Sequence, residues 1–480
     1  KEFELSSTNL ENNLESITLK KPNQVYYEIY KKAREKAKEA KKAAILAFLE
    51  AKNIKKTYML DIKFIRENSK LVKAAATKKK ISVDVDDLIR LDDERLELLR
   101  DIESLRSEQN MQSKDVQNTA DTLAREQLVA RMREIKESLK DKETTYNTIL
   151  EQWQNLMWKI PNIPDMTVPD GVSDADNIQI KTWGEKKTFD FDARDHVDIM
   201  EALDMVDFGR GGKVHGFRGY FLKNDAVRLS FAIWQYALEF FSEKGFNPMM
   251  APAIVREENL YGTGHLPNEA EDVYKTQDDD YLAGTAEVPV MGYHRDEVLE
   301  EKSFPIKYLA FTPCYRREAG SHGKDTRGLI RVHEFYKWEQ VMLCEASHQK
   351  SVEYHDWLNR NTEEFIESLD IPYQTVLNCG GDLGQGQVKK YDIELWVPME
   401  GKYREISSAS YFHDFQTRRF NIRYKDNEGK MRFAHSLNCT AIPTPRILVS
   451  LIENFQQADG TIKIPEVLQK YLSGREYFGK

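Results

Sequence analysis

Residues 312–339 read TPCYRREAGSHGKDTRGLIRVHEFYKWE. The pattern predicts a strand that ends in Arg316 and Glu318, a glycine-rich polar loop, and a return strand that carries Phe335 and Glu339. Because antiparallel pairing brings the two ends of such a segment together, these side chains should meet at one spot. There, a planar guanidinium can hold a carboxylate and a phosphate together, and a phenylalanine can stack on a purine. An Arg-x-Glu sequence considered alone is ordinarily a surface ion pair.

Three short motifs lie outside this stretch, one before it and two after it. The first is Gly284-Thr285-Ala286-Glu287; the others are Glu405-Ile406-Ser407-Ser408 and Leu437-Asn438-Cys439-Thr440, which Arg446 follows. An apolar, strand-like run that ends at Pro252 comes after a long helical pattern. Each motif is too short to identify a function alone, so the informative feature is their order along the chain.

In this order the motifs resemble those of the seryl-tRNA synthetase family of class II aminoacyl-tRNA synthetases. Residues 312–339 resemble motif 2, the run ending at Pro252 resembles motif 1, and the Asn438 segment with Arg446 resembles motif 3. The resemblance covers about Met59 to Leu472. It implies that the chain uses ATP and Mg²⁺ to convert L-serine to seryl-adenylate, releases pyrophosphate, and transfers serine to the 3′ end of tRNA(Ser). It also implies a symmetric homodimer, because class II dimers bind tRNA across subunits.

The resemblance also implies a role for each site residue. Arg316 would contact the α-phosphate and the serine carboxylate, and Arg446 would reach the γ-phosphate, which makes these two the catalytic residues. Glu318 would hold the adenine amino group, and Phe335 would stack on its ring. The implied serine-binding set is Thr285, Glu287, Arg316, Glu339, Asn438 and Thr440. The implied ATP-binding set is Arg316, Glu318, Val332, Phe335, Glu405, Ile406, Ser407, Ser408 and Arg446, of which Glu405 and Ser408 would also bind Mg²⁺.

The sequence departs from the family pattern at motif 3. Thr440 stands where many members have serine, a change that keeps the hydroxyl group. Two prolines precede Arg446, and they are predicted to lie in the first turn of a helix, where proline is tolerated. A related ligase that loads a carrier protein would lack a tRNA-binding arm. A catalytically inactive RNA-binding relative should have lost Arg316, Glu318, Glu405 or Arg446, and a purely structural coiled-coil protein would not need these motifs.

Two heptad patterns precede the motifs and predict an antiparallel coiled-coil hairpin. Their apolar positions are Leu88, Leu91, Leu98, Ile102 and Leu105 in the first, and Leu128, Met132, Ile135, Leu139, Tyr146, Ile149, Trp153 and Leu156 in the second. Arg95 and Lys142 interrupt these seams, and the polar stretch Asn110–Thr119 is predicted to connect the helices. The pattern alone fits a dimerisation coil or a structural hairpin as well as it fits a binding arm.

By the resemblance, this hairpin is the arm that lies along the long variable arm of the tRNA. The basic residues implied to contact RNA there are Arg100, Arg106, Arg125 and Arg131, accompanied by Lys114 and Arg133. In the motif 2 loop, Arg327 would approach the acceptor end, together with Lys324 and Arg331. A basic helical face read without the resemblance is ordinarily a solvated surface.

The sequence predicts three regions. Residues 1–58 form an extension with a Lys/Ala/Glu-rich helix, which is either a solvated or fusion-derived helix or an RNA-binding one. Residues 59–160 form the coiled-coil arm, and a proline-rich segment then breaks the helix and marks a boundary. Residues 161–480 form the catalytic domain, whose strand-like runs are dispersed among helices. This favours an α+β fold with flanking helices on a mostly antiparallel sheet.

Composition restricts the function classes further. The formal net charge is −9 and the pI about 5.8, so RNA contacts must use local basic patches and no DNA partner is expected. The four cysteines are scattered without a CxxC pair, which indicates neither a disulfide framework nor a zinc site. No apolar run approaches the roughly 20 residues that span a bilayer. We therefore expect a soluble cytoplasmic enzyme with no membrane partner.

Overall fold

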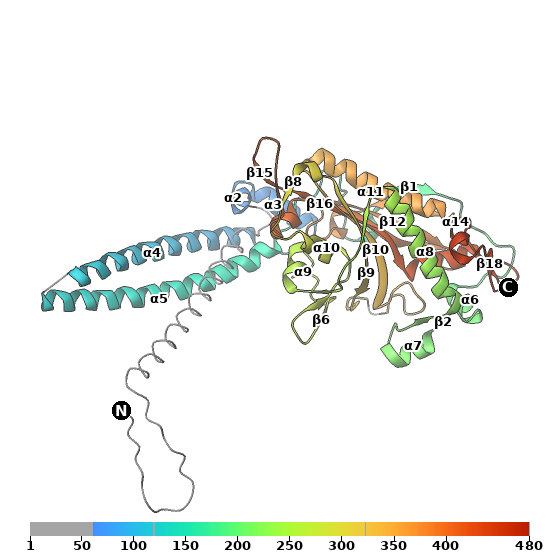
Figure 1. The fold of residues 1–480 in the computed structure, drawn as a ribbon, viewed down its shortest axis with the longest axis horizontal. Helices are drawn as coiled ribbons and strands as arrows, with labels where there is room; N and C mark the ends of the chain where they lie inside the picture. The colour runs from blue at the N-terminus through green and yellow to red at the C-terminus, as the bar shows by residue number, and fades with distance from the viewer. Residues whose placement is uncertain (1–60, 119–120, 322, 480) are drawn as a thin grey trace, which may run out of the picture. The chain divides into compact units, whose positions relative to one another are not determined.

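The structure, a computed structural model, describes residues 61–118, 121–321 and 323–479, all within one compact unit. The basic helix expected within residues 1–58 lies outside these described residues. The described residues build an α+β fold around an eight-stranded sheet, as predicted (Figure 1). No helix in this part of the chain is long and apolar enough to cross a membrane.

The strand order of the sheet is β1-β11-β12-β13-β16-β10-β9-β4. Every neighbouring pair is antiparallel except β4 with β9, which is parallel. The strands span Ile178–Trp183 (β1), Asn247–Met250 (β4), Ile306–Tyr315 (β9), Glu334–Cys344 (β10), Tyr373–Leu377 (β11), Lys389–Val397 (β12), Lys402–His413 (β13) and His435–Thr444 (β16). The motif 2 stretch therefore contributes the β10–β9 pair, which lies next to the edge strand β4. β9 ends at Tyr315, before Arg316 and Glu318.

Three helices pack on one face of this sheet: α8 (Asn224–Glu243), α11 (His348–Ser368) and α13 (Arg446–Phe455). Hydrogen bonds between strand side chains and these helices show which side chains point to the helix-covered face. Gln340 of β10 donates to Leu358 O and Thr362 Oγ1 of α11, and Trp234 Nε1 of α8 donates to Thr444 Oγ1 at the end of β16. Because successive strand residues point to opposite faces, their neighbours along β10 and β16 point to the face without these helices.

The remaining elements are short and surround the sheet. The helices are α2 (Ile62–Glu67), α3 (Ser69–Lys78), α6 (His196–Ala202), α7 (Phe208–His215), α9 (Glu257–Thr263), α10 (Glu287–Tyr293), α12 (Phe415–Arg419) and α14 (Glu466–Gln469). The strands are β2 (Val206–Asp207), β3 (Phe221–Leu222), β5 (Ile254–Val255), β6 (Tyr274–Lys275), β7 (Tyr281–Leu282), β8 (Val298–Glu300), β14 (Arg423–Lys425), β15 (Met431–Phe433), β17 (Ile462–Lys463) and β18 (Tyr477–Phe478).

The predicted hairpin is present as α4 (Val85–Asn118) and α5 (Thr122–Lys159), which run side by side (Figure 1). The predicted connection was wrong, because residues 110–118 continue α4, which ends at Asn118, and α5 begins at Thr122. This stretch contains no glycine or proline, so its polarity reflects solvent exposure and not a break in the helix. The Asp121 side chain accepts from Leu123 N and caps the start of α5.

The two charged seam residues are paired. The Arg95 guanidinium donates to Asp92 at 2.7 Å and lies 4.6 Å from the ring centroid of Trp153. Lys142 donates to Asp101 of the opposite helix at 2.6 Å. Each charged side chain therefore has an oppositely charged partner within the coiled coil, so neither seam position contains an unpaired charge.

The base of the arm is hydrogen-bonded to the loop that precedes β12. Lys79, which follows α3, is buried, and its Nζ donates to the carbonyl oxygens of Gly384 at 3.2 Å, Gln385 at 2.9 Å and Gln387. Asn162, just after α5, donates to the carbonyl oxygens of Gly386 and Phe412. The loop of residues 384–387 is thus held from the side of the arm.

Three histidines at the start of β16, the end of β13 and within α11 should make stability depend on pH. Burial lowers the pKa of His355 and His413 to about 4 and that of His435 to about 3. Each ring takes up a proton on unfolding below its ordinary pKa of 6.5, so the free energy of unfolding is insensitive to them above that pH and falls as the pH drops toward 4. The limiting slope is about 1.4 kcal/mol per pH unit for each histidine.

Urea unfolding between pH 7.5 and 4.5 measures this slope, and His435→Asn should make it shallower. A free energy of unfolding that stays flat over this range in the unsubstituted chain would contradict the assignment.

Candidate active site

A polar cavity of about 450 Å³ lies on the sheet face opposite α8 and α11, and it continues into a narrower recess of about 60 Å³. We call these the polar chamber and the narrow chamber. Five residues border both of them: Arg316, Glu318, Lys337, Glu405 and Thr440. Of the residues predicted to bind serine, ATP or Mg²⁺, Ser407 alone has a side chain that borders neither chamber.

The polar chamber contains all six residues of the predicted serine-binding set. Thr285 and Glu287 stand at the start of α10, whereas Glu339 belongs to β10, and Asn438 and Thr440 to β16. Thr285 Oγ1 and Thr440 Oγ1 lie 3.4 Å and 3.3 Å from Glu339 Oε2. All of these side chains except that of Arg316 are buried. Buried hydroxyls and carboxylates that converge in this way form a pocket for a small substrate with a cation and a hydroxyl group.

Glu287 is the second carboxylate of this chamber. It accepts a hydrogen bond from Gln416 Nε2, and burial raises its pKa above the ordinary value. A carboxylate in this position gains from any cationic group that enters the chamber, because burial has removed the water that would otherwise solvate it.

Sequence analysis missed Lys337, which lies at the floor of the chamber. Its Nζ donates to Thr285 Oγ1 at 2.9 Å and Thr440 Oγ1 at 3.4 Å and forms an ion pair with Glu339. The sequence could have indicated this position. Lys337 lies two residues from both Phe335 and Glu339, so the three side chains must share one face of β10.

The narrow chamber is bordered by seven of the nine residues predicted to bind ATP, all except Ser407 and Ser408. The Arg316 guanidinium lies 5.4 Å from the ring centroid of Phe335 and donates to Gly284 O at 3.3 Å. Arg446, the first residue of α13, donates to Ile330 O and Glu405 O, each at 2.9 Å. Desolvation lowers the pKa of Arg446. Two guanidinium groups and an aromatic ring therefore border one recess, an arrangement suited to phosphates and a flat heterocycle.

Glu318 has a backbone φ of +53°, in the left-handed region that residues other than glycine seldom occupy. Its carboxylate accepts from Arg331 Nη1 at 2.6 Å, and Arg331 also pairs with Asp325, which in turn accepts from Arg404 at 2.5 Å. This chain of ion pairs offsets the local strain and fixes the turn that follows β9. In this arrangement a ligand that bonds to Glu318 would share the carboxylate with Arg331.

A β-bulge explains which side chains of the Glu405–Ser408 motif face the cavity. Glu394 pairs with Glu405 and Ile393 with Ser407, so Ile406 is the extra residue. A regular strand would place positions three apart on opposite faces, whereas the bulge brings both Glu405 and Ser408 to the polar chamber. The Ser407 side chain instead points to the helix-covered face, where its Oγ donates to Thr440 O at 2.6 Å.

The expectation for the prolines before Arg446 was wrong. β16 continues through Pro443, which pairs with Lys337 of β10, and Pro445 is the N-cap of α13. Pairing with β13 reaches only Cys439 of β16, so Pro443 occupies a part of the strand that is free on that side and needs no amide hydrogen there.

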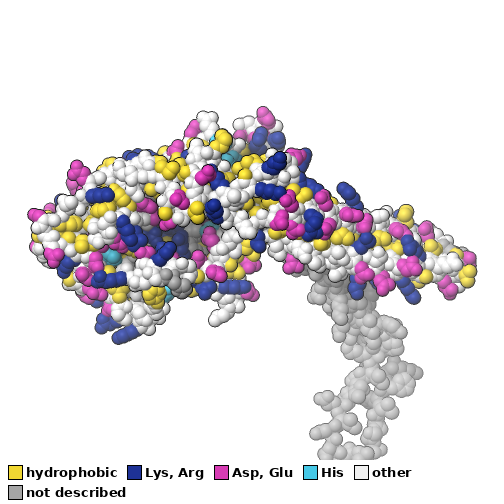
Figure 2. All heavy atoms as spheres, turned by 180° about the vertical axis from the view of Figure 1, so that it is seen from behind, with side chains coloured by type: hydrophobic (Ala, Val, Ile, Leu, Met, Phe, Trp, Pro, Cys, Tyr) yellow, Lys and Arg dark blue, Asp and Glu magenta, His cyan; other side chains and the backbone are white. Residues whose placement is uncertain are grey.

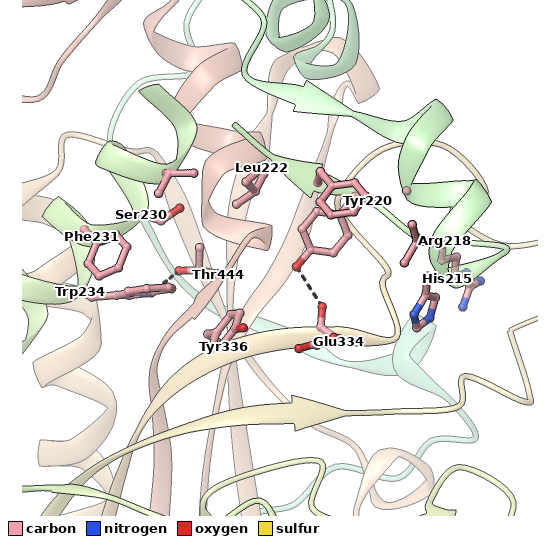
Figure 3. Close-up of a pocket in the computed structure, with 15 residues that line it drawn as sticks. His215, Arg218, Tyr220, Leu222, Ser230, Phe231, Trp234, Glu334, Tyr336 and Thr444 are labelled. Carbon is pink, nitrogen blue, oxygen red and sulfur yellow. Dashed lines mark hydrogen bonds between the residues drawn. The ribbon is translucent and has the colours of Figure 1, made fainter. Parts of the chain in front are cut away.

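A larger and mainly apolar cavity of about 590 Å³ lies on the other face of β10. Figure 3 shows Tyr220, Trp234 and Tyr336 around it, with Tyr220 donating to Glu334 O. Glu334 and Tyr336 alternate with Phe335 and Lys337, so one strand borders both cavities. Convergent charged groups are found in the polar chamber and not here, so we assign the chemistry to the polar chamber.

The predicted RNA-contact residues of the arm, Arg100, Arg106, Arg125 and Arg131, are all exposed. Arg106 pairs with Glu143 at 2.7 Å, and Arg131 pairs with Glu108 and Glu134. Figure 2 shows basic and acidic side chains interspersed along this face of the arm. In the motif 2 loop, Arg327 is paired with Asp195 and Asp198 of the α6 region.

Comparisons with known proteins give consistent matches. Residues 59–164 match the family model of the seryl-tRNA synthetase N-terminal domain, and residues 273–455 match the class II core domain of synthetases for G, H, P, S and T. The chain is 43% identical to the serine–tRNA ligase of Deinococcus radiodurans, over 88% of this chain and 99% of that one. It is 42% identical to that of Thermodesulfovibrio yellowstonii, over 86% and 99%.

Solved structures agree. Seryl-tRNA synthetase from Pyrococcus horikoshii, complexed with ATP, superposes with a TM-score of 0.78 at 39% identity, over 88% of this chain and 99% of that one. The cytoplasmic enzyme of Naegleria fowleri, in complex with AMP, superposes with a TM-score of 0.74 at 31% identity and the same coverage.

Proposed function

The chain belongs to the seryl-tRNA synthetase family, and on that premise we propose how its two chambers carry out the reaction. It is an ATP-dependent ligase that activates L-serine to seryl-adenylate, releases pyrophosphate, and transfers the seryl group to the 3′ end of tRNA(Ser). We assign the serine and ATP sites from the way charged groups are distributed between the two chambers. Buried carboxylates and hydroxyls converge at one end, and two guanidinium groups with an aromatic ring converge at the other.

The polar chamber would hold serine. Glu287 and Glu339 would face its ammonium and hydroxyl groups, with Thr285, Asn438 and Thr440 completing the pocket. Arg316, which borders both chambers, would hold the serine carboxylate beside the α-phosphate of ATP. The carboxylate oxygen then attacks the α-phosphorus in line as pyrophosphate leaves. In the second step a ribose hydroxyl of tRNA attacks the carbonyl carbon of the mixed anhydride, and the acyl–phosphate bond breaks to release AMP. Both steps need positioning and charge stabilisation and no covalent nucleophile from the protein.

The narrow chamber would hold the nucleotide. Phe335 would stack on the adenine, Glu318 would accept from its amino group, and Arg446 would reach the γ-phosphate. Val332 and Ile406 border the same recess and would contact the base and ribose through apolar surface. Ser407 would contribute only through its backbone, because its side chain lies on the other face of the sheet.

The residues at the bulge fit a magnesium ion. No group of three or more His, Cys, Asp or Glu side chains able to bind an ion is found among the described residues. Glu405 and Ser408 offer one carboxylate and one hydroxyl, and Mg²⁺ commonly combines so few protein oxygens with substrate phosphates and water. When bound, the ion supplies positive charge against the phosphates of ATP.

Residues 59–160 would bind tRNA, and residues 161–480 would form the catalytic domain. The exposed arginines of the arm would contact the RNA backbone, and the motif 2 loop would approach the acceptor end. Arg327 would have to exchange its partners Asp195 and Asp198 for phosphate. A cytoplasmic location is supported by four cysteines that are buried free thiols, as is usual in a reducing compartment.

The apolar cavity supports a homodimer. Exposed apolar side chains gather around it on α7 and α8, among them Val214, which is 76% exposed, and Phe231, which is 63% exposed. Contiguous apolar surface of this kind marks a protein interface. Phe231→Asp combined with Val214→Asp should convert a dimeric sedimentation profile to a monomeric one. Met166→Asp, at a fully exposed apolar residue away from this cavity, should leave it dimeric; an unsubstituted chain that sediments as a monomer would refute the dimer.

The direct test of the reaction is ATP–pyrophosphate exchange with serine, threonine, alanine, cysteine and glycine in turn, without tRNA. We expect exchange that strongly favours serine, because a buried site built to bond a hydroxyl rejects analogues without one. Folded protein that binds tRNA but exchanges with none of the five would identify an inactive RNA-binding relative.

A further inference from the structure

Lys337 is a buried lysine in the polar chamber that none of the roles above uses. Its ammonium group has three N–H donors, and three groups of the chamber surround it: Thr285 Oγ1 at 2.9 Å, Thr440 Oγ1 at 3.4 Å, and the Glu339 carboxylate. All three partners belong to the serine-binding set, and they come from three different elements, α10 with its preceding turn, β16 and β10 itself. The lysine therefore connects three elements of the pocket through hydrogen bonds and an ion pair.

The hydrogen bonds from Lys337 set the direction of the threonine hydroxyls. Each hydroxyl has one proton, and each oxygen accepts from the ammonium, so each proton is free to point to Glu339 Oε2, at 3.4 Å from Thr285 Oγ1 and 3.3 Å from Thr440 Oγ1. Glu339 Oε1 lies 3.5 Å from Thr440 Oγ1, at the limit of a hydrogen bond, and is the oxygen most open to a donor from the substrate. The pocket is thus polarised before serine enters.

The charge of Lys337 also matters to the carboxylates. Glu287 and Glu339 are both buried in one chamber, where burial and the like charge of Glu339 raise the pKa of Glu287. One ammonium beside Glu339 reduces the formal charge of this group of three from −2 to −1. That is the charge that one substrate ammonium neutralises, while the substrate carboxylate is left for Arg316.

We propose that Lys337 is a positioning residue for serine, which fixes Thr285, Thr440 and Glu339 and offsets part of the negative charge of the chamber. The proposal rests on the assignment of the polar chamber to serine. We expect Lys337 to affect the binding of the amino acid and not that of ATP, although the lysine borders both chambers.

The test is ATP–pyrophosphate exchange by Lys337→Met, which keeps most of the length of the side chain and removes the charge. We expect the KM for serine to rise about 100-fold or more, because removing one member of a buried ion pair leaves its partner uncompensated. The KM for ATP should change less than threefold. Lys337→Gln, which keeps two N–H donors without the charge, should have a serine KM between those of the wild type and Lys337→Met.

The matched control is Lys307→Met, the same substitution on the neighbouring strand β9, outside both chambers. It should keep both KM values within twofold. A serine KM within threefold of wild type in either folded Lys337 variant would overturn the proposal. So would parallel rises in the KM for serine and for ATP, which indicate general damage to the sheet; if Lys337→Met does not fold, Lys337→Gln decides alone. Absence of serine-dependent exchange in the wild type and Lys307→Met would instead refute the proposed function itself.

Discussion

Arg316→Ala should lower kcat/KM for serine-dependent ATP–pyrophosphate exchange by about 1,000-fold, equivalent to roughly 4 kcal/mol of transition-state stabilisation. The guanidinium lies where the polar and narrow chambers meet, and it alone would hold both the attacking carboxylate and the α-phosphate. Arg316 is exposed, and its contacts are with Gly284 O and the face of Phe335. Its removal should therefore leave the thermal unfolding temperature nearly unchanged, so the loss would report on chemistry.

Two further variants sharpen this result. Arg316→Lys keeps the charge but loses the fork that spans two anionic groups, and it should still lose about 100-fold. Arg317→Ala, next in sequence but bordering neither chamber, should remain within threefold of wild type. Exchange by Arg316→Ala within tenfold of wild type would mean that another cation, such as Arg446, positions the reacting groups.

Much of the fold could be predicted because the informative residues follow simple periods. The heptad spacing of the arm predicts two paired helices, and the alternation within β9 and β10 predicts which side chains share a face. The length of α4 was underestimated because a polar stretch such as residues 110–118 has the composition of a loop and yet contains no residue that ends a helix.

The parts of the site that could not be predicted depend on pairing between distant strands. The bulge at Ile406 exists only because β12 pairs with β13 out of simple register, and it alone explains why Ser408 and not Ser407 faces the cavity. The ion pairs of Arg327 and Arg331 likewise depend on Asp195 and Asp325, which no local pattern connects to them. Lys337 differs, because its spacing of two residues from Glu339 can be read from the sequence. Its contacts with Thr285 and Thr440 cannot.

Removal of the distal arm should separate the two half-reactions. A chain in which residues 98–147 are replaced by a short Gly/Ser linker should keep serine-dependent exchange within threefold of wild type, while its rate of tRNA(Ser) charging falls by about 1,000-fold or more. The reason is that tRNA binding draws on many phosphate contacts, each of which adds affinity. The deletion removes the packed distal cluster Ile102, Ile135 and Leu139 with the exposed arginines, and it keeps the basal cluster that includes Leu88, Leu91, Trp153 and Met157.

The deletion keeps the base of the arm, which contacts the active site. Lys79 and Asn162 stay bonded to the backbone of residues 384–387, and Gly384 and Gln387 border the polar chamber, so the shortened chain keeps that wall of the active site. A full-length control with Arg100→Glu and Arg125→Glu should charge tRNA more slowly, with a weaker dependence on salt, and should exchange normally. Normal charging by the shortened chain would show that the arm is structural, whereas loss of exchange would show that the distal arm supports the active site through its base.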